Sequence, residues 1–140
     1  YALGRLESCV IHLEKQRIGR LSDIEMPMET ECEEKLGLER FTRIKPEAEK
    51  MEYVYSYRVQ YSDLDKSHHM ANLRYVNLME NVFSPDFYSC HSVKEMELHY
   101  TAQSFYSDEI RVYKKDMGNC CQIAGKKEDG TDVFLGMMAF

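Results

Sequence analysis

Several features that mark common classes of protein are missing from this sequence. Its five cysteines are odd in number and form no Cys-x-x-Cys pair, which argues against a disulfide framework and for reduced thiols in a reducing compartment. The separations between the histidines match no zinc pattern, so no metal site is expected. A glycine-rich phosphate-binding loop and a Gly-x-Ser-x-Gly nucleophile turn are also missing, and we expect no bound cofactor.

Long apolar runs and an excess of basic residues are lacking as well. No apolar run approaches the roughly 20 residues that a membrane span requires, and the start lacks the basic-then-apolar layout of a signal peptide. A formal net charge of -6 at pH 7 argues against nucleic-acid binding. With 140 residues, of which 44% are hydrophobic, we expect a soluble, cytoplasmic chain with one whole domain at most and no membrane contact.

The segment from Tyr61 to Val76, which reads YSDLDKSHHMANLRYV, carries the richest side-chain chemistry of the chain. It combines two carboxylates, two imidazoles and an asparagine. A carboxylate and an imidazole with pKa values near the working pH can exchange protons with a bound substrate. The alternative interpretation is structural: Asp63 and Asp65 would be turn residues, and Asn72 would be the N-cap of a helix.

The flanking residues predict a strand before this segment and a helix after it. From Glu52 to Tyr61, tyrosine or valine at the odd positions alternates with mostly polar residues, which is typical of a half-buried strand. After the polar turn, apolar residues at three- and four-residue spacing line one face of a helix, which we expect Asn72 to cap and Pro85 to end. These apolar residues are Tyr75, Val76, Met79, Val82 and Phe83.

Four further strands are expected after the helix. They are predicted at Glu95–Gln103, around Ile110–Tyr113, at Cys120–Ala124 and at Val133–Phe140. The last is apolar almost throughout, which indicates a central strand that is buried on both faces. Glycines in the turns at Asp116–Asn119 and Asp129-Gly130 predict hairpins. From Met51 onward we therefore expect an α+β domain in which an antiparallel sheet wraps a long central helix.

This arrangement resembles the hot-dog fold, and the motif at Ser62–Asn77 resembles more narrowly the acyl-acyl-carrier-protein thioesterases. Their pattern is Ser-Asp-Leu-Asp, an Asn two residues on, a His two further on, then Val-Asn-Asn and a Tyr. The stretch LHYTAQSFYSDEI at Leu98–Ile110 resembles the second motif of this family, and SCVIHLEKQRIGRL at Ser8–Leu21 is similar to the end of its first hot-dog repeat. The resemblance covers the second repeat nearly whole and only the tail of the first.

On this resemblance the chain divides into three parts. Residues 1–24 would be the tail of a preceding hot-dog repeat, residues 25–50 an acidic and basic linker, and residues 51–140 the hot-dog thioesterase domain. Because the chain begins at Tyr1 rather than Met, we expect a truncated chain or one that has lost its first repeat. An exposed sheet edge invites pairing with another copy, so we predict a homodimer in which the second subunit replaces that repeat.

The resemblance also implies a set of catalytic residues. Asp65 falls on the carboxylate of the first motif and His69 on its imidazole. The chain departs from the family at several positions: Ser67 stands where the family has Asn, and Ala71 replaces the first of its paired Asn residues. Gln103 stands where the family has Glu, and Ser104 where the plant enzymes often have Cys. A glutamine cannot take a proton from water at neutral pH, so the base would be Asp65 or His69. Ser67 and Gln103 would orient water or substrate.

The implied reaction is hydrolysis of a fatty acyl thioester on acyl carrier protein, which yields free fatty acid and carrier in fatty acid biosynthesis. Backbone amides at the start of the helix, at Asn72, would hold the oxyanion. The acyl chain would run beside Tyr75 and Met79, although such residues are more often plain core. Two alternatives stay open: an acyl-CoA thioesterase, and a non-catalytic hot-dog module that binds acyl groups or supports a partner repeat.

Binding of the predicted partner, acyl carrier protein, would require a basic surface on this chain. Carrier proteins are acidic, so docking to this acidic chain requires a local basic patch. The candidates are Lys114, Lys115, Lys126 and Lys127, with Arg17 and Arg20 as a second possibility. The alternative is that these residues are scattered charges that keep the protein in solution.

Overall fold

The computed structural model describes residues 4–6, 11–12, 14, 17–20, 22, 24, 37 and 50–140. The chain forms two compact units, Tyr1–Arg40 and Phe41–Phe140. In the first unit, β1 (Ile11–His12) pairs antiparallel with β2 (Arg17–Ile18). The predicted linker at residues 25–50 lies outside the described residues except for Gly37 and Lys50, and the three-part division of the chain stays a prediction.

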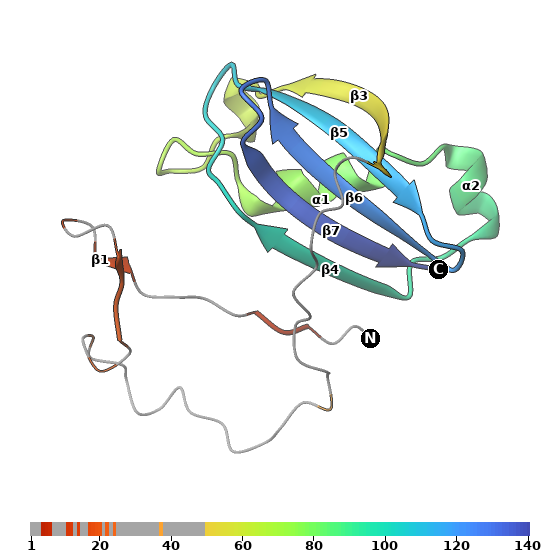
Figure 1. The fold of residues 1–140 in the computed structure, drawn as a ribbon, viewed down its shortest axis with the longest axis horizontal. Coiled ribbons are helices and arrows are strands. Elements are labelled where there is room, and N and C mark those ends of the chain that lie inside the picture. The colour runs from red at the N-terminus through yellow and green to blue at the C-terminus, as the bar shows by residue number, and fades with distance from the viewer. Residues whose placement is uncertain are drawn as a thin grey trace. The chain divides into compact units, whose positions relative to one another are not determined.

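The second unit is built on a five-stranded antiparallel sheet (Figure 1). Its strands are β3 (Glu52–Arg58), β4 (Glu95–Tyr100), β5 (Glu109–Asp116), β6 (Cys120–Lys127) and β7 (Asp132–Ala139). They lie in the order β3-β5-β6-β7-β4, and every strand predicted from Glu52 onward is present. The last strand, β7, lies between β6 and β4 and is buried at most positions, which confirms that it is an inner strand.

Hairpins join the three inner strands into the predicted meander. Tyr113 of β5 lies opposite Ala124 of β6, which lies opposite Leu135 of β7. The connecting turns contain Gly118 and Gly130 at φ angles of 85° and 87°, a conformation that glycine adopts readily because it lacks a Cβ. The outer strands β3 and β4 each pair on one side only within the described sheet. Pairing of such an edge with a second copy stays a prediction.

The helix predicted between Asn72 and Pro85 is shorter in the structure, and a second helix follows it. α1 (Asn72–Glu80) has nine residues, and α2 (Pro85–Cys90) follows after a turn. Pro85 begins a helix instead of ending one, because the first helical position needs no N–H and Ser84 caps the helix by accepting the Phe87 N–H at 3.2 Å. Neither these helices nor any other in the described part of the chain is long and apolar enough to cross a membrane.

The prediction that Asn72 caps the first helix is also wrong. The N-cap of α1 is Ala71, whose backbone is extended and whose side chain offers no cap hydrogen bond. The Ala71 N–H donates to the carbonyl of Asp63 at 2.8 Å, which keeps the chain extended up to this position. The helix therefore begins with Asn72 as its first residue, and its first amides receive no side-chain cap.

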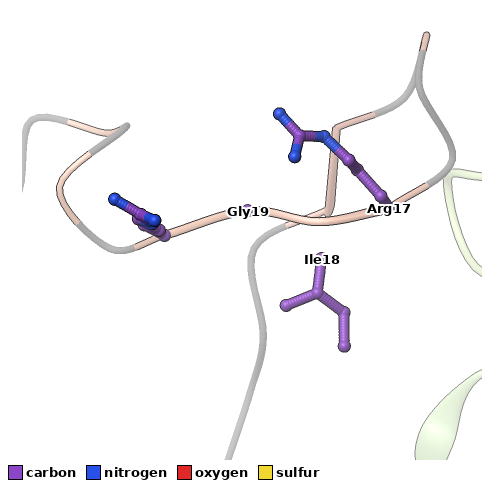
Figure 2. A pocket seen from close by; sticks show the side chains of 4 residues that line it. Arg17, Ile18 and Gly19 are labelled. Atoms are coloured by element: carbon purple, nitrogen blue, oxygen red, sulfur yellow. The ribbon is translucent and has the colours of Figure 1, made fainter.

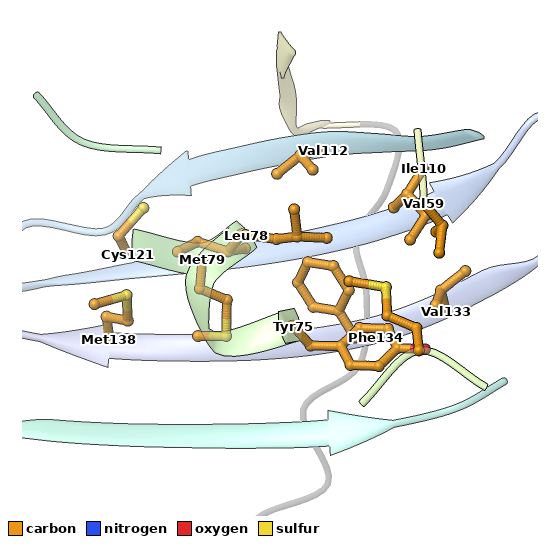
Figure 3. Packing of buried hydrophobic residues seen from close by; sticks show 12 residues of the cluster. Val59, Tyr75, Leu78, Met79, Ile110, Val112, Cys121, Val133, Phe134 and Met138 are labelled. Carbon is orange, nitrogen blue, oxygen red and sulfur yellow. The ribbon is translucent and has the colours of Figure 1, made fainter. Parts of the chain in front are cut away.

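The core lies between α1 and one face of the sheet (Figure 3). Tyr75, Leu78 and Met79 contribute the buried face of the helix and are at most 3% exposed. A Cβ at Gly136 of β7 would overlap the end of the Met79 side chain, which would have to shift to admit it. The Tyr55 hydroxyl of β3 donates to the Leu78 carbonyl at 2.7 Å, which fastens the helix to the edge strand.

Candidate functional site

The predicted site loop connects β3 to α1. After β3 the chain makes a 3-10 turn, η4 (Tyr61–Asp63), and Leu64 then pairs with Met70 in a single antiparallel bridge. Inside this bridge, the Asp65 N–H donates to the carbonyl of His69 at 2.8 Å. The residues from Asp65 to His69 therefore form a closed loop just before α1, and we call this segment the site loop.

Asp65 stabilises the site loop from within. Its Oδ1 accepts the backbone N–H of Ser67 at 2.8 Å and that of His69 at 3.3 Å. This bonding is typical of an Asx turn, which is the structural interpretation of Asp65. Asp65 and Ser67 are both exposed, and no described residue donates a hydrogen bond to the second carboxylate oxygen of Asp65. That oxygen is accessible to a water molecule or a substrate.

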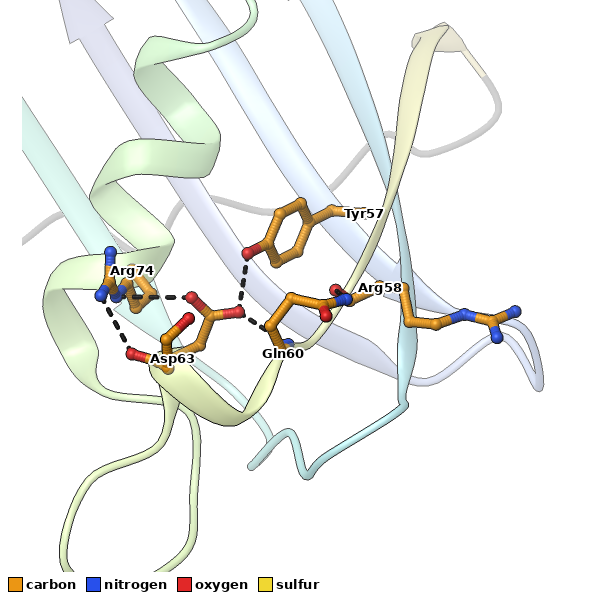
Figure 4. A network of polar contacts seen from close by, with 6 residues as sticks. Tyr57, Arg58, Gln60, Asp63 and Arg74 are labelled. Carbon is orange, nitrogen blue, oxygen red and sulfur yellow. Dashed lines mark hydrogen bonds and ion pairs between the residues drawn. The ribbon is translucent and has the colours of Figure 1, made fainter.

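The buried carboxylate of this region belongs to Asp63 (Figure 4). Asp63 is 4% exposed, and its Oδ2 accepts hydrogen bonds from the Tyr57 hydroxyl at 2.6 Å and the Gln60 N–H at 2.8 Å. Its Oδ1 forms an ion pair with Nε of Arg74 at 3.5 Å. The Arg74 guanidinium also donates to the Ser62 carbonyl at 3.0 Å. The Asp63 carboxylate thus joins the end of β3 to α1, and so holds both ends of the site loop.

Sequence reasoning recognises Asp63 only as a turn residue and misses this network. Two signals point to it: a tyrosine on an inward-facing strand position, Tyr57, and the single cation of the helix, Arg74, because a buried carboxylate requires donors. Burial raises the pKa of Tyr57 above its ordinary value, and the hydrogen bond to Asp63 and the charge of that carboxylate act in the same direction. The Arg74 cation lowers the Tyr57 pKa and opposes these effects.

The segment that follows β4 lies against the site loop. The Met70 N–H donates to the Ser104 carbonyl at 2.8 Å. The ring of His69 lies edge to face with the ring of Phe105, and the ring centroids are 5.1 Å apart. Gln103 is exposed, and its side chain forms no hydrogen bond with the site loop in the described part of the chain. The structure therefore brings the two predicted motifs together through the contact between His69 and Phe105, whereas the Gln103 side chain does not take part.

Two side chains at this junction have unused hydrogen-bonding groups. His69 is half-buried, and its ring nitrogens form no hydrogen bond with any residue between 50 and 140. The imidazole is therefore available to exchange a proton with water or substrate. Ser104 is completely buried, and its hydroxyl has no partner among the described residues, which is rare and unfavourable in a folded protein.

The residues predicted to bind substrate lie in two different environments. Asn72 is exposed, and its carbonyl accepts the Tyr100 hydroxyl at 3.2 Å. Tyr75 packs edge to face against Tyr100 and Phe134, with centroid distances of 5.4 Å and 5.9 Å, and Met79 is fully buried. This packing agrees with a plain core role for Tyr75 and Met79. A role for them in lining an acyl chain stays a prediction.

Other candidate sites offer less chemistry. Arg17, Ile18, Gly19 and Arg20 line a hollow of about 270 Å³ in the first unit, and none of them is a carboxylate or an imidazole (Figure 2). In the predicted docking patch, Lys126 pairs with Asp132 at 2.6 Å and Lys114 with Asp116 at 3.7 Å, and docking of a carrier protein there stays a prediction. Within the described residues, no group of three or more His, Cys, Asp or Glu side chains is placed to hold a metal ion.

Comparison with protein families shows where this chain belongs. Residues 44–133 match the family described as acyl-ACP thioesterase C-terminal domain. The chain is a member of the acyl-ACP thioesterase C-terminal domain family. This match confirms the family that the motifs at Ser62–Asn77 and Leu98–Ile110 predict. A search of curated proteins found no match.

Solved structures confirm the hot-dog fold of this family member. An acyl-ACP thioesterase from Bacteroides thetaiotaomicron has 23% sequence identity and a TM-score of 0.78, and the match covers 93% of this chain and 52% of that one. The chain thus spans about half the length of that protein. Protein SAV2348 from Staphylococcus aureus, solved in complex with CoA, has 18% identity and a TM-score of 0.54 over 63% of this chain and 74% of that one. YbaW, a probable thioesterase from Escherichia coli, has 17% identity and a TM-score of 0.53 over 61% of this chain and 78% of that one.

Proposed function

We propose that this chain carries the acid/base centre of a thioesterase that hydrolyses fatty acyl thioesters of acyl carrier protein in fatty acid biosynthesis. One observation supports this proposal most: the hydrogen bond from Met70 to Ser104 holds the loop of Asp65 and His69 beside the segment of Gln103. Membership of the acyl-ACP thioesterase C-terminal domain family supports the same class of reaction.

The proposed reaction needs a base, a water molecule and a site for an oxyanion. His69 or Asp65 takes a proton from water, and the water oxygen forms a bond to the carbonyl carbon of the thioester. The carbon–sulfur bond then breaks, and the proton passes to the sulfur of the leaving thiol. The amides of Asn72 and Leu73 stabilise the oxyanion, because the first N–H groups of a helix have no partner within it and Ala71 supplies no side-chain cap.

The first test removes the two acid/base groups. We expect Asp65→Asn and His69→Ala each to lower the rate of thioester hydrolysis about a hundredfold or more, the usual effect of losing a positioned acid or base. The rate is measured as thiol release from acyl-carrier substrates of several chain lengths. His68→Asn is the matched control: His68 is exposed at a φ angle of 60°, which asparagine tolerates, and its loss should leave the rate within about twofold. Wild-type rates in both site variants, with folding confirmed by circular dichroism, would sink the assignment.

The same assay separates the alternatives. An acyl-CoA thioesterase is favoured by the solved relatives, since one was solved with CoA and another, from Staphylococcus aureus, is a DHNA-CoA thioesterase. Faster turnover of acyl-CoA than of acyl-carrier substrates would support that alternative. A non-catalytic module is favoured by Gln103, which cannot act as a base. Binding of a fatty acid without turnover of any thioester would support the module.

Gln103→Glu tests the alignment of the second motif. If Gln103 occupies the position of the family's carboxylate, the substitution restores a potential base and should raise the rate of hydrolysis. Its exposed side chain leaves room for the added charge. Tyr106→Glu, at an exposed position of the same segment, is the control and should bring no gain. An unchanged or reduced rate in folded Gln103→Glu would count against the alignment.

A further inference from the structure

The imidazole of His69 is held in an unusual way. A catalytic histidine is commonly oriented by a hydrogen bond to one ring nitrogen, which sets the position of the other. Neither ring nitrogen of His69 has such a partner among the described residues. The imidazole contacts the ring of Phe105 instead, and the two ring centroids lie 5.1 Å apart at an interplanar angle of 81°. The orientation of the imidazole therefore depends on an aromatic edge-to-face contact.

Phe105 is itself held by a half-buried charge pair. The Phe105 N–H donates to Oδ2 of Asp108 at 2.9 Å, and the Asp108 N–H donates back to the Phe105 carbonyl at 3.1 Å. Nζ of Lys127, at the end of β6, contacts the same Asp108 oxygen at 2.6 Å, and the two side chains are only 20% and 27% exposed. Nζ also lies 5.4 Å from the centroid of the Phe105 ring. Asp108 and Lys127 thus fix both the backbone and the ring of Phe105.

The turn that presents Phe105 is anchored to the core. The Ser107 N–H donates to the carbonyl of buried Val59 at 3.0 Å, and the Val59 N–H donates to the Asp108 carbonyl at 2.9 Å. Ser107 has a φ angle of 68°, which a residue other than glycine rarely adopts, so the surrounding bonds impose this conformation. With the Met70–Ser104 bond on the other side, the turn is fixed to the residue that follows β3, to the end of β6 and to the residue that follows the site loop.

We infer that Phe105 is a positioning residue: it holds the His69 imidazole in the orientation that proton transfer requires, and Asp108 and Lys127 fix Phe105 in turn. The inference rests on the proposed thioesterase function. Phe105 is 46% exposed, so its ring adds little to the core, and its well-anchored position is explained by its contact with His69. An imidazole without this contact would occupy several rotamers, and only a fraction of the molecules would hold the base correctly.

The test compares Phe105→Leu, which removes the ring, with Phe105→Tyr, which keeps it. We expect Phe105→Leu to lower kcat about tenfold with KM within about twofold, and Phe105→Tyr to retain the wild-type kcat. In a His69→Ala background, Phe105→Leu should cause no further loss, because its effect acts through the imidazole. Tyr106→Leu removes a neighbouring exposed ring and is the control, with kcat expected within about twofold. An equal loss in both backgrounds, or a loss in KM alone, would overturn the inference.

A second measurement separates this inference from the proposed function. The side-chain rotamer of His69, measured by NMR from three-bond scalar couplings without substrate, should become averaged over several rotamers in Phe105→Leu and stay as in wild type in Phe105→Tyr. If the wild-type chain hydrolyses no thioester, the proposed function fails, yet the NMR spectra still decide whether Phe105 orients His69. An unchanged His69 rotamer in Phe105→Leu would overturn the positioning role whatever the activity. If Phe105→Leu does not fold, Phe105→Met, which also lacks the ring, takes its place in both measurements.

Discussion

The buried Asp63 carboxylate offers the sharpest test of how the site loop is held. Asp63→Asn keeps the size and shape of the side chain and removes its charge. The two donors on Oδ2, the Tyr57 hydroxyl and the Gln60 N–H, then meet a neutral acceptor, and the Arg74 cation loses its counterion. The substitution therefore weakens three interactions without creating a cavity.

The expected size of the effect follows from these contacts. Hydrogen bonds to a charged group contribute about 1.5–3 kcal/mol each and neutral ones about 0.5–1.5 kcal/mol, so two weakened bonds cost roughly 2–3 kcal/mol. The Arg74 side chain is 42% exposed, so solvent screening limits the ion pair to at most about 0.5 kcal/mol more. A loss of this size should lower Tm by on the order of 10 °C in a domain of about 100 residues. Tyr57→Phe removes one of these bonds to the charged carboxylate entirely and should cost about 1.5–3 kcal/mol.

Urea and thermal unfolding followed by circular dichroism measure these losses. The matched control is Tyr53→Phe in the same strand, because the Tyr53 hydroxyl forms only an exposed hydrogen bond with Ser56 at 3.2 Å. We expect this control to change the free energy of unfolding by less than about 0.5 kcal/mol. If Asp63→Asn and Tyr57→Phe were as stable as the Tyr53→Phe control, the claim that Asp63 holds the loop would be refuted.

Two further predictions concern groups whose pKa is raised. Burial raises the pKa of Cys121 to about 12, whereas Cys90 is exposed. Iodoacetamide at about pH 8 should therefore alkylate Cys90 at least about tenfold faster than Cys121, as measured by peptide mass spectrometry. Equal rates would contradict the burial of Cys121. Burial also raises the pKa of Tyr55 and Tyr57 above 10.0, so the folded chain keeps protons that the unfolded chain loses as the pH rises past that value. The free energy of unfolding should therefore fall as the pH rises above about 10, and it should fall less steeply in Tyr55→Phe. If the free energy of unfolding had the same pH dependence in wild type and variant, this linkage would be wrong.

Local patterns were sufficient to predict the strands and the hairpins. A strand places alternate side chains on opposite faces, so the run of tyrosines at Tyr53, Tyr55 and Tyr57 indicates β3 without knowledge of its partner. The glycines at Gly118 and Gly130 indicate turns because their positive φ angles suit a residue without a Cβ. The hot-dog family could be predicted for the same reason, since its motifs are short and continuous in the chain.

Helix ends were less predictable, because they depend on competition between neighbouring hydrogen bonds. Asn72 has the chemistry of a cap, yet the bond from Ala71 to the Asp63 carbonyl decides where α1 begins. Pro85 is compatible both with the end of one helix and with the start of another, and the Ser84 side chain decides for the start. The distinction requires knowledge of which donors and acceptors meet in space.

The composition of the candidate site depended on tertiary structure most of all. Asp63 and Asp65 have the same side chain and lie two positions apart, but only Asp63 is buried. Tyr57 from the strand and Arg74 from the helix both contact the Asp63 carboxylate. The contact between His69 and Phe105 arises because the segment after β4 returns to the site loop. Such contacts join residues that are distant in the chain, and the order of strands that creates them leaves no local pattern in the sequence.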